Sequence, residues 1–319
     1  MRLALLVDME SPGSLVGQVL EERYLIEEEL GCGAMGTVFR ARHVRVRREV
    51  AIKVLHAHHM ADPLMVERFD REAATVARLH HKNLVNVIDV GETADRQCFM
   101  VLELVRGPSL ASLINDSLLD RARVLQLTRQ ILAGLAHAHA AGLVHRDLKP
   151  ENVIVERDDL GTEVPRIVDF GIAVLRDQST ARRLTTAGTI IGTPAYMAPE
   201  QAQAGEPDPR TDLFALGVMV YEMLAGRLPF DGSSMEIVLA NMSLDPPAMA
   251  ERARAGVDID PVLEAFARKL MARRLPDRFA SARAALEVLE LVEHDREAAA
   301  RALGLVERDR EAAARALGL

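Results

Sequence analysis

The run His-Arg-Asp-Leu-Lys-Pro-Glu-Asn at 145–152 gathers a carboxylate, two cations and an amide within a few positions. Apolar residues precede and follow it, and Pro150 disfavours helix at Lys149, so we expect a rigid loop between two short strands. Polar groups in such a place cost stability unless they are paired or used. The spacing suits phosphoryl transfer, in which Asp147 orients a hydroxyl, Lys149 neutralises the moving phosphate and Asn152 holds a metal ion.

A second group of residues that could do chemistry lies nearer the N-terminus, where Gly31, Gly33 and Gly36 separate two predicted strands. Glycines let two strands and their turn fold closely over phosphates, where backbone N–H groups reach oxygens. The pattern is weak alone, because such spacing also occurs in ordinary turns. Lys53 ends an apolar strand and Glu72 lies beside the apolar stripe of a predicted helix, so each charge supplies the partner that the other needs.

The elements that must position these residues change in type along the chain. Short alternating runs over 24–105 predict antiparallel strands, with one helix over about 63–80. After Gly107 the apolar period is helical, with a long buried helix over 124–138. The stretch 213–224 is too apolar for a surface helix and is predicted to be a buried pillar.

Composition limits the classes of protein that need to be considered. The chain has 319 residues, of which 49% are hydrophobic and 27% charged, as in globular proteins. A net charge of -8 without a long basic block argues against a nucleic-acid partner. No apolar run reaches the roughly 18 residues of a membrane span. Two cysteines suggest a reducing compartment, so we expect a cytoplasmic protein in which 1–23 is a disordered leader.

The C-terminal stretch 292–319 is a tandem repeat of one 14-residue sequence. The copies 292–305 and 306–319 differ only at His294 and Arg308. Each copy ends in Ala-Leu-Gly-Leu, and glycine breaks helices. Two copies are also too few for a coiled coil, so we interpret the repeat as a frayed tail.

The motifs, in this order, resemble those of the protein kinase family, and in particular bacterial serine/threonine kinases. Three further motifs belong to the pattern: Val-Ala-Ile-Lys ending at Lys53, Asp169-Phe170-Gly171, and Ala198-Pro199-Glu200. The resemblance implies an α+β, bilobal protein kinase fold with ATP between the lobes. A small antiparallel-sheet N-lobe would span 24–105, and a larger, mainly helical C-lobe would span 106–291.

The resemblance also assigns roles to residues. Those implied in catalysis are Asp147, Lys149, Lys53 and Glu72. Those implied in ATP binding are Gly31, Gly33, Gly36, Val38, Ala51, Lys53, Leu102, Glu103, Val105 and Ile154. Mg²⁺, or Mn²⁺ as the alternative, would be held by Asn152 and Asp169. Thr193 would contact the substrate, and the structural residues would be Arg146, Glu200, Asp212 and Arg278. The activation-loop phosphosite would be Thr189, with Thr185 and Thr186 as secondary candidates.

The implied reaction transfers the γ-phosphate of ATP to Ser or Thr hydroxyls of protein substrates, with autophosphorylation of the activation loop. Two alternatives stay open: a pseudokinase acting as a binding scaffold, and a small-molecule phosphotransferase of related fold. The first usually lacks Lys53, Asp147 or Asp169, and the second lacks the run from Lys149 to Asn152. A homodimer is also left open. Histidines such as His139 lack metal-ligand company and are read as helix-face or loop residues.

Overall fold

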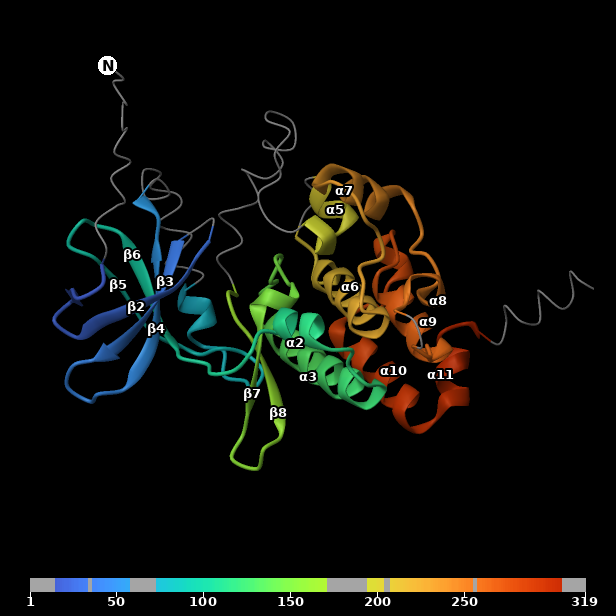
Figure 1. The fold of residues 1–319 in the computed structure, drawn as a ribbon, viewed down its shortest axis with the longest axis horizontal. Helices are drawn as coiled ribbons and strands as arrows, with labels where there is room; N and C mark the ends of the chain where they lie inside the picture. The colour runs from blue at the N-terminus through green and yellow to red at the C-terminus, as the bar shows by residue number, and fades with distance from the viewer. Residues whose placement is uncertain are drawn as a thin grey trace, which may run out of the picture. The chain divides into compact units, whose positions relative to one another are not determined.

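The computed structural model describes residues 15–33, 36–57, 73–170, 194–203, 207–254 and 257–305. The chain forms two compact units, whose strands and helices are labelled in Figure 1. We call 1–66 with 87–104 the sheet unit, and 67–86 with 105–319 the helical unit. The expected α+β class is confirmed, because strands dominate the first unit and helices the second.

The sheet unit contains one antiparallel sheet of six strands in the order β1-β2-β3-β4-β6-β5. Its strands are β1 (Val19–Leu20), β2 (Tyr24–Cys32), β3 (Gly36–His43), β4 (Glu49–Leu55), β5 (Val87–Glu92) and β6 (Cys98–Glu103). Successive side chains of a strand point to opposite faces. Ile52 and Val54 of β4 therefore pack into the buried cluster with Phe39 and Val101, and Ala51 and Lys53 point the other way.

Strand β1 corrects one expected boundary. It lies within the segment expected to be a disordered leader, yet Leu20 is buried and pairs with Tyr24 of β2. A strand of two residues is too short for alternation to reveal it. The sheet thus begins before Tyr24, and residues 1–14 lie outside the described residues.

The helical unit is built around the predicted pillar, α6 (Arg210–Ala225), which is buried on nearly all sides. Other helices among the described residues of this unit are α2 (Leu110–Asp116), α3 (Arg121–Ala140), α5 (Pro199–Ala202), α7 (Ser234–Ser243), α8 (Met249–Arg252), α9 (Pro261–Leu270), α10 (Ala282–His294) and α11 (Arg296–Ala302). Short 3₁₀ turns in the part of this unit that the structure describes include η2 (Pro150–Asn152), η3 (Pro194–Tyr196) and η4 (Leu275–Asp277). A hairpin of β7 (Val153–Arg157) and β8 (Glu163–Ile167) completes the unit.

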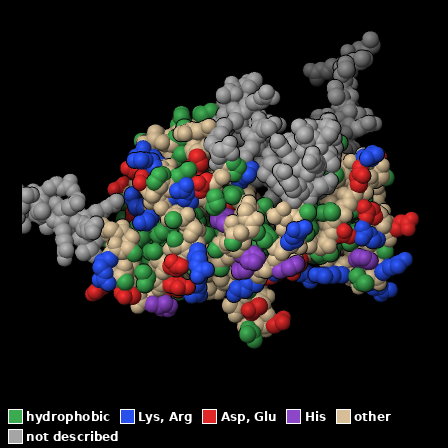
Figure 2. All heavy atoms as spheres, turned by 180° about the vertical axis from the view of Figure 1, so that it is seen from behind, with side chains coloured by type: hydrophobic (Ala, Val, Ile, Leu, Met, Phe, Trp, Pro, Cys, Tyr) green, Lys and Arg blue, Asp and Glu red, His purple; other side chains and the backbone are tan. Residues whose placement is uncertain are grey.

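Surface chemistry is mixed in sign. On the face drawn in Figure 2, Lys and Arg side chains are interspersed with Asp and Glu. Within the described ranges, no helix has both the length and the apolar character that crossing a bilayer requires.

The first copy of the C-terminal repeat is folded, which corrects the expectation of a frayed tail for 292–305. Helix α10 runs through the expected domain end at 291, and Asp295 then caps α11 by accepting a hydrogen bond from Ala298 N at 3.0 Å. Gly304, expected from the sequence to break a helix, follows the end of α11 in a left-handed conformation with φ 71°. The second copy, 306–319, lies outside the described residues.

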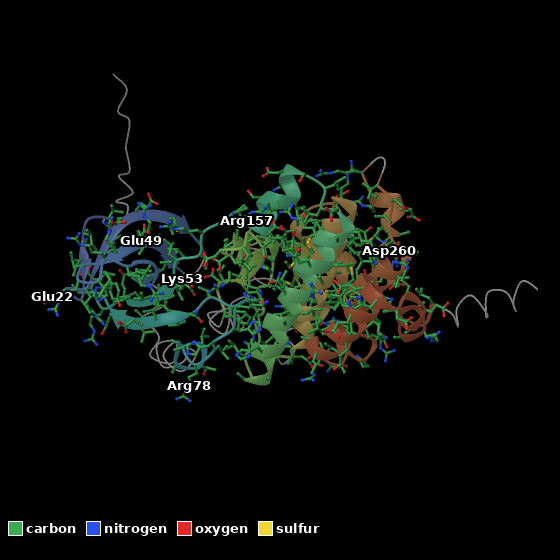
Figure 3. All side chains as sticks on the ribbon, turned by 90° about the horizontal axis from the view of Figure 1, so that it is seen from below. Glu22, Glu49, Lys53, Arg78, Arg157 and Asp260 are labelled. Carbon is green, nitrogen blue, oxygen red and sulfur yellow. The ribbon has the colours of Figure 1, made fainter. Side chains whose placement is uncertain are left out.

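An ion pair fastens α11 to the N-terminus of α9. Arg296 donates to both carboxylate oxygens of Asp260, at 2.7 and 3.0 Å, and Arg121 donates to the same carboxylate at 2.6 Å. Burial opposes the charged form, but the hydrogen bonds from Arg296 and Arg121 hold the pKa of Asp260 well below its usual value. Asp260 is labelled among the C-terminal helices in Figure 3.

Replacing Ala299 by glutamate is expected to lower the free energy of unfolding by about 3 kcal/mol, because Ala299 is fully buried and the new carboxylate would have no partner. Urea unfolding monitored by circular dichroism measures the loss. Ala302→Glu is the matched control, because Ala302 is exposed on the same helix. Equal losses in the two variants would mean that α11 is not docked.

Candidate active site

Some of the residues implied in nucleotide binding share the face of the sheet that lies opposite its hydrophobic core. Lys53 pairs in register with Val38 of β3 and Met100 of β6, and Ala51 pairs with Leu102. Lys53 is 7% exposed, so the sheet buries most of the side chain. Figure 3 labels Lys53 among these strands. The register therefore gathers a lysine and small or aliphatic side chains on one surface, which suits a planar base next to phosphates.

The glycine turn between β2 and β3 is tightly closed, with Gly33 N donating to Gly36 O at 2.9 Å. A Cβ atom on Gly36 would lie 2.2 Å from Val54 O, so only glycine lets β3 approach β4 so closely here. A Cβ on Gly31 would meet nothing within 4 Å. Close packing therefore requires glycine at Gly36, whereas the open space at Gly31 does not.

Gly36→Ala is expected to lower the free energy of unfolding by about 1–3 kcal/mol, because the added methyl must push the backbone of β4 away. Thermal unfolding followed by circular dichroism measures the change. Gly31→Ala is the control, and we expect it to unfold within about 0.5 kcal/mol of the original protein, as at an open site. A larger loss in the control would contradict this account of the turn.

The helical unit holds the predicted catalytic loop in a compact arrangement. Lys149 Nζ lies 3.1 Å from Asp147 Oδ2, and Asn152 Nδ2 donates to Asp147 O at 2.8 Å. The turn at Pro150 produces these contacts, because Asn152 N also bonds back to Lys149 O at 2.9 Å. The carboxylate is thereby placed beside one cation on a loop fixed at both ends, which suits a group that orients a hydroxyl.

Asn152 and Asp169 supply oxygen donors of the kind that a hard divalent cation takes. The amide nitrogen of Asn152 is committed to Asp147 O, so its oxygen is the atom left for a ligand. The main-chain N–H of Val168 donates to the main-chain carbonyl oxygen of Asn152 at 2.9 Å. This bond joins the start of the Asp169 motif to the predicted catalytic loop. Mg²⁺ needs only a few protein oxygens, because water and phosphates complete its shell. The two residues fit that role.

Asp212, at the start of α6, holds the predicted catalytic loop in place by hydrogen bonds to its main chain. Its carboxylate accepts hydrogen bonds at 2.8 Å from each of three donors: His145 N, Arg146 N and His139 Nε2. Complete burial disfavours the charged form, but the hydrogen bond from His139 and the contacts with His145 hold the pKa of Asp212 below its ordinary value. Arg146 has φ 63°, so the fixed N–H groups hold a strained turn next to Asp147.

His139 lies on a helix, α3, as the sequence interpretation allowed, but its contact with Asp212 was not predicted. Its partner, Asp212, is distant in sequence, so no local spacing of residues predicts the contact. His145 plays a second supporting part, because its ring accepts from Asp147 N at 3.2 Å and lies 2.9 Å from Val168 O. The same ring contacts Phe170 edge-on, with centroids 4.6 Å apart.

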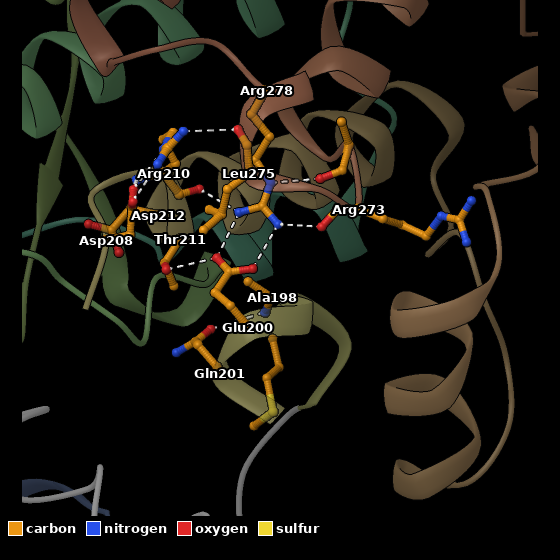
Figure 4. Close-up of polar contacts among 12 residues, drawn as sticks. Ala198, Glu200, Gln201, Asp208, Arg210, Thr211, Asp212, Arg273, Leu275 and Arg278 are labelled. Atoms are coloured by element: carbon orange, nitrogen blue, oxygen red, sulfur yellow. Dashed lines mark hydrogen bonds and ion pairs between the residues drawn. The ribbon is translucent and has the colours of Figure 1, made fainter. Parts of the chain in front are cut away.

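A buried ion pair between Arg278 and Glu200 holds helix α5 against the rest of the helical unit (Figure 4). Arg278 donates to both carboxylate oxygens of Glu200, at 2.7 and 2.8 Å. It also bonds to the carbonyls of Ala272 and Arg210, and Thr211 Oγ1 donates to Glu200 at 2.9 Å. Every polar atom of the guanidinium is satisfied, so the pair can be buried without an uncompensated charge.

The remaining predicted site residues lie either outside the described residues or in different units. Those outside the described residues are Glu72, Thr185, Thr186, Thr189 and Thr193. Val105 and Ile154 belong to the helical unit, and Glu103 ends β6 in the sheet unit. The convergence of both units around one nucleotide remains a prediction.

The sequence matches one known protein family over most of its length. Residues 24–290 match the family described as the protein kinase domain. The chain belongs to the protein kinase family. That span covers most of the chain, and both halves of the candidate active site lie within it.

Relatives of this chain occur in several bacteria. It is 37% identical over 284 residues to the serine/threonine-protein kinase pkn3 of Myxococcus xanthus, covering 88% of this chain and 52% of that protein. It is 37% identical over 293 residues to the serine/threonine-protein kinase PknL of Mycobacterium tuberculosis, covering 91% of this chain and 70% of PknL. The kinase therefore spans about half the length of pkn3, and only 29% of pkn2 from Myxococcus xanthus.

Solved structures agree with the fold of this chain. The PknI kinase domain of Mycobacterium tuberculosis superposes with a TM-score of 0.65 at 28% identity, covering 86% of this chain and 97% of that domain. Its sheet-rich and helical parts thus have counterparts in a kinase domain solved by crystallography.

Proposed function

We propose that this protein is a serine/threonine protein kinase that transfers the γ-phosphate of ATP to hydroxyl groups of protein substrates. The observation that carries the proposal is the pairing of Asp147 with Lys149 and Asn152 on one fixed loop. A scaffold that only binds nucleotide has no need for a carboxylate held beside a cation in this way.

Each of the proposed active-site residues has a defined task. Asp147 orients the substrate hydroxyl and takes its proton, and Lys149 balances charge on the phosphate that is transferred. Lys53 holds the phosphates of ATP from the sheet. Asn152 and Asp169 would bind Mg²⁺, which supplies neutralisation of phosphate charge when it is bound. Because such catalysis is mostly positioning and electrostatics, the fixed loop accounts for much of it.

Regulation and location extend the proposal. We infer that Thr189, with Thr185 and Thr186 as secondary sites, is phosphorylated by the kinase itself. A phosphate adds about 1.5 to 2 negative charges, which Arg146 is suited to bind. Cys32 is exposed and Cys98 is buried, and no disulfide joins them, in keeping with a cytoplasmic location.

Incubation with γ-labelled ATP, Mg²⁺ and a pool of Ser/Thr peptides tests the function. We expect phosphoserine or phosphothreonine in the peptides and in the protein itself, with both signals lost in Lys53→Met. Binding of ATP without any transfer would instead indicate a scaffold. Labelling of small molecules alone would indicate a phosphotransferase of the other type.

A further inference from the structure

Asn241, near the end of α7, uses its amide nitrogen in an unusual way. The residue is 3% exposed, and Nδ2 donates to two main-chain carbonyls, Ala195 O at 3.1 Å and Met197 O at 3.3 Å. Both carbonyls belong to the stretch Pro194–Ala198, which we call the docking segment. One side chain thus satisfies two acceptors that alternate along a short buried backbone.

The docking segment is also fixed to the catalytic loop on its other side. Gln201 accepts from Ala198 N at 3.0 Å and donates to Arg146 O at 2.7 Å, the carbonyl just before Asp147. Tyr196 OH donates to Glu222 at 2.6 Å. Two carboxamides, on α5 and α7, therefore hold one strip of backbone beside the proposed catalytic aspartate.

This placement matters for a polypeptide substrate. Gln201 joins the docking segment to Arg146 O, one residue before Asp147. An extended chain advances about 3.3 Å per residue, so a peptide whose hydroxyl reaches Asp147 can reach the docking segment with its neighbouring residues. The shape of that segment then limits which peptides fit. A shift of its backbone would weaken peptide binding and leave the nucleotide side unaffected.

We propose that Asn241 is a positioning residue for the protein substrate, acting through the carbonyls of Ala195 and Met197. The inference rests on the proposed kinase function and adds the residue that sets the peptide-binding surface. Removing the amide donor leaves two buried acceptors without their partner, which costs about as much as the loss of one or two hydrogen bonds. The segment must then move to regain partners.

Peptide kinetics test the proposal in the full-length chain. Asn241→Asp keeps the shape and removes the donor, and Asn241→Ser is a smaller change in case the first variant folds poorly. We expect KM for the peptide to rise about tenfold in each, with kcat and KM for ATP within about twofold of the original. Leu239→Ser on the same helix, 53% exposed, is the control and should change none of these constants.

The pH profile of Asn241→Asp gives a second readout that a merely structural role would not move. A buried carboxyl has a raised pKa, and its protonated form can donate to one carbonyl. The peptide KM of this variant should therefore recover as the pH is lowered from about 8 to about 6. The Asn241→Ser variant has no titrating group there and should not recover.

Two results would overturn the inference. One is a peptide KM unchanged in both variants, and the other is a parallel loss of kcat, ATP affinity and melting temperature. If the unmodified protein transfers no phosphate to any peptide, the proposed function itself fails. If it does and the Asn241 variants match it, only the role of Asn241 fails.

Discussion

Asp147→Asn is expected to lower the rate of phosphoryl transfer by about 10²- to 10⁴-fold, the usual contribution of a general base. The amide cannot take the proton of the hydroxyl, and Lys149 loses the carboxylate that lies 3.1 Å away. The main-chain bond from Asn152 to residue 147 is retained, so the loop should keep its shape. Single-turnover transfer from labelled ATP to a peptide measures the effect.

The matched control for this prediction is Asp159→Asn, which makes the same change in the exposed turn between β7 and β8. We expect full turnover in the control and unchanged ATP binding and melting temperature in both variants. If Asp147→Asn retained more than about a tenth of the activity, Asp147 would not be the general base.

Arg278→Gln is expected to destabilise the helical unit by about 3–5 kcal/mol, because it leaves the Glu200 carboxylate buried without its cation. The Arg278 side chain is 0% exposed and that of Glu200 is 14% exposed, so solvent cannot substitute for the lost bonds. Arg278 also lies over the Phe214 ring, with 5.0 Å between the guanidinium carbon and the ring centroid, and this contact would be lost too. The midpoint of urea unfolding reports the loss.

The control for Arg278 is another Arg–Glu pair of this unit, between Arg283 and Glu287 on the surface of α10. The side chains of that pair are 84% and 65% exposed, and such pairs contribute about 0–1 kcal/mol. Arg283→Gln should therefore leave the unfolding midpoint nearly unchanged. Similar midpoints for Arg278→Gln and Arg283→Gln would mean that the Glu200 pair is not a brace.

Elements buried over a run of consecutive residues could be predicted from the sequence. The strand β4 is buried from Val50 to Leu55, on the core face and on the face that carries Ala51 and Lys53, so it forms a short apolar run broken only by Lys53. The pillar α6 was predictable because burial on all sides leaves an almost uninterrupted apolar run. The catalytic loop was predictable because its functional groups are neighbours in sequence.

Features that depend on partners distant in sequence could not be predicted in this way. His139 and Asn241 each occupy an ordinary helical position, and only the folded chain shows which carboxylate or carbonyl each one meets. The docking of α11 depends on Asp260, which the sequence does not link to Arg296. Strand β1 is too short to have a period.

The docked half of the C-terminal repeat has an implication for how this gene can change. The only difference between the two copies falls at His294, whose side chain is 77% exposed, whereas Val292 and Ala299 are fully buried. Loss of 292–305 would join Leu291 to Val306 and recreate the same apolar and charged pattern, with arginine in place of that histidine. Recombination between the copies could therefore shorten the chain without removing the surface that covers α9.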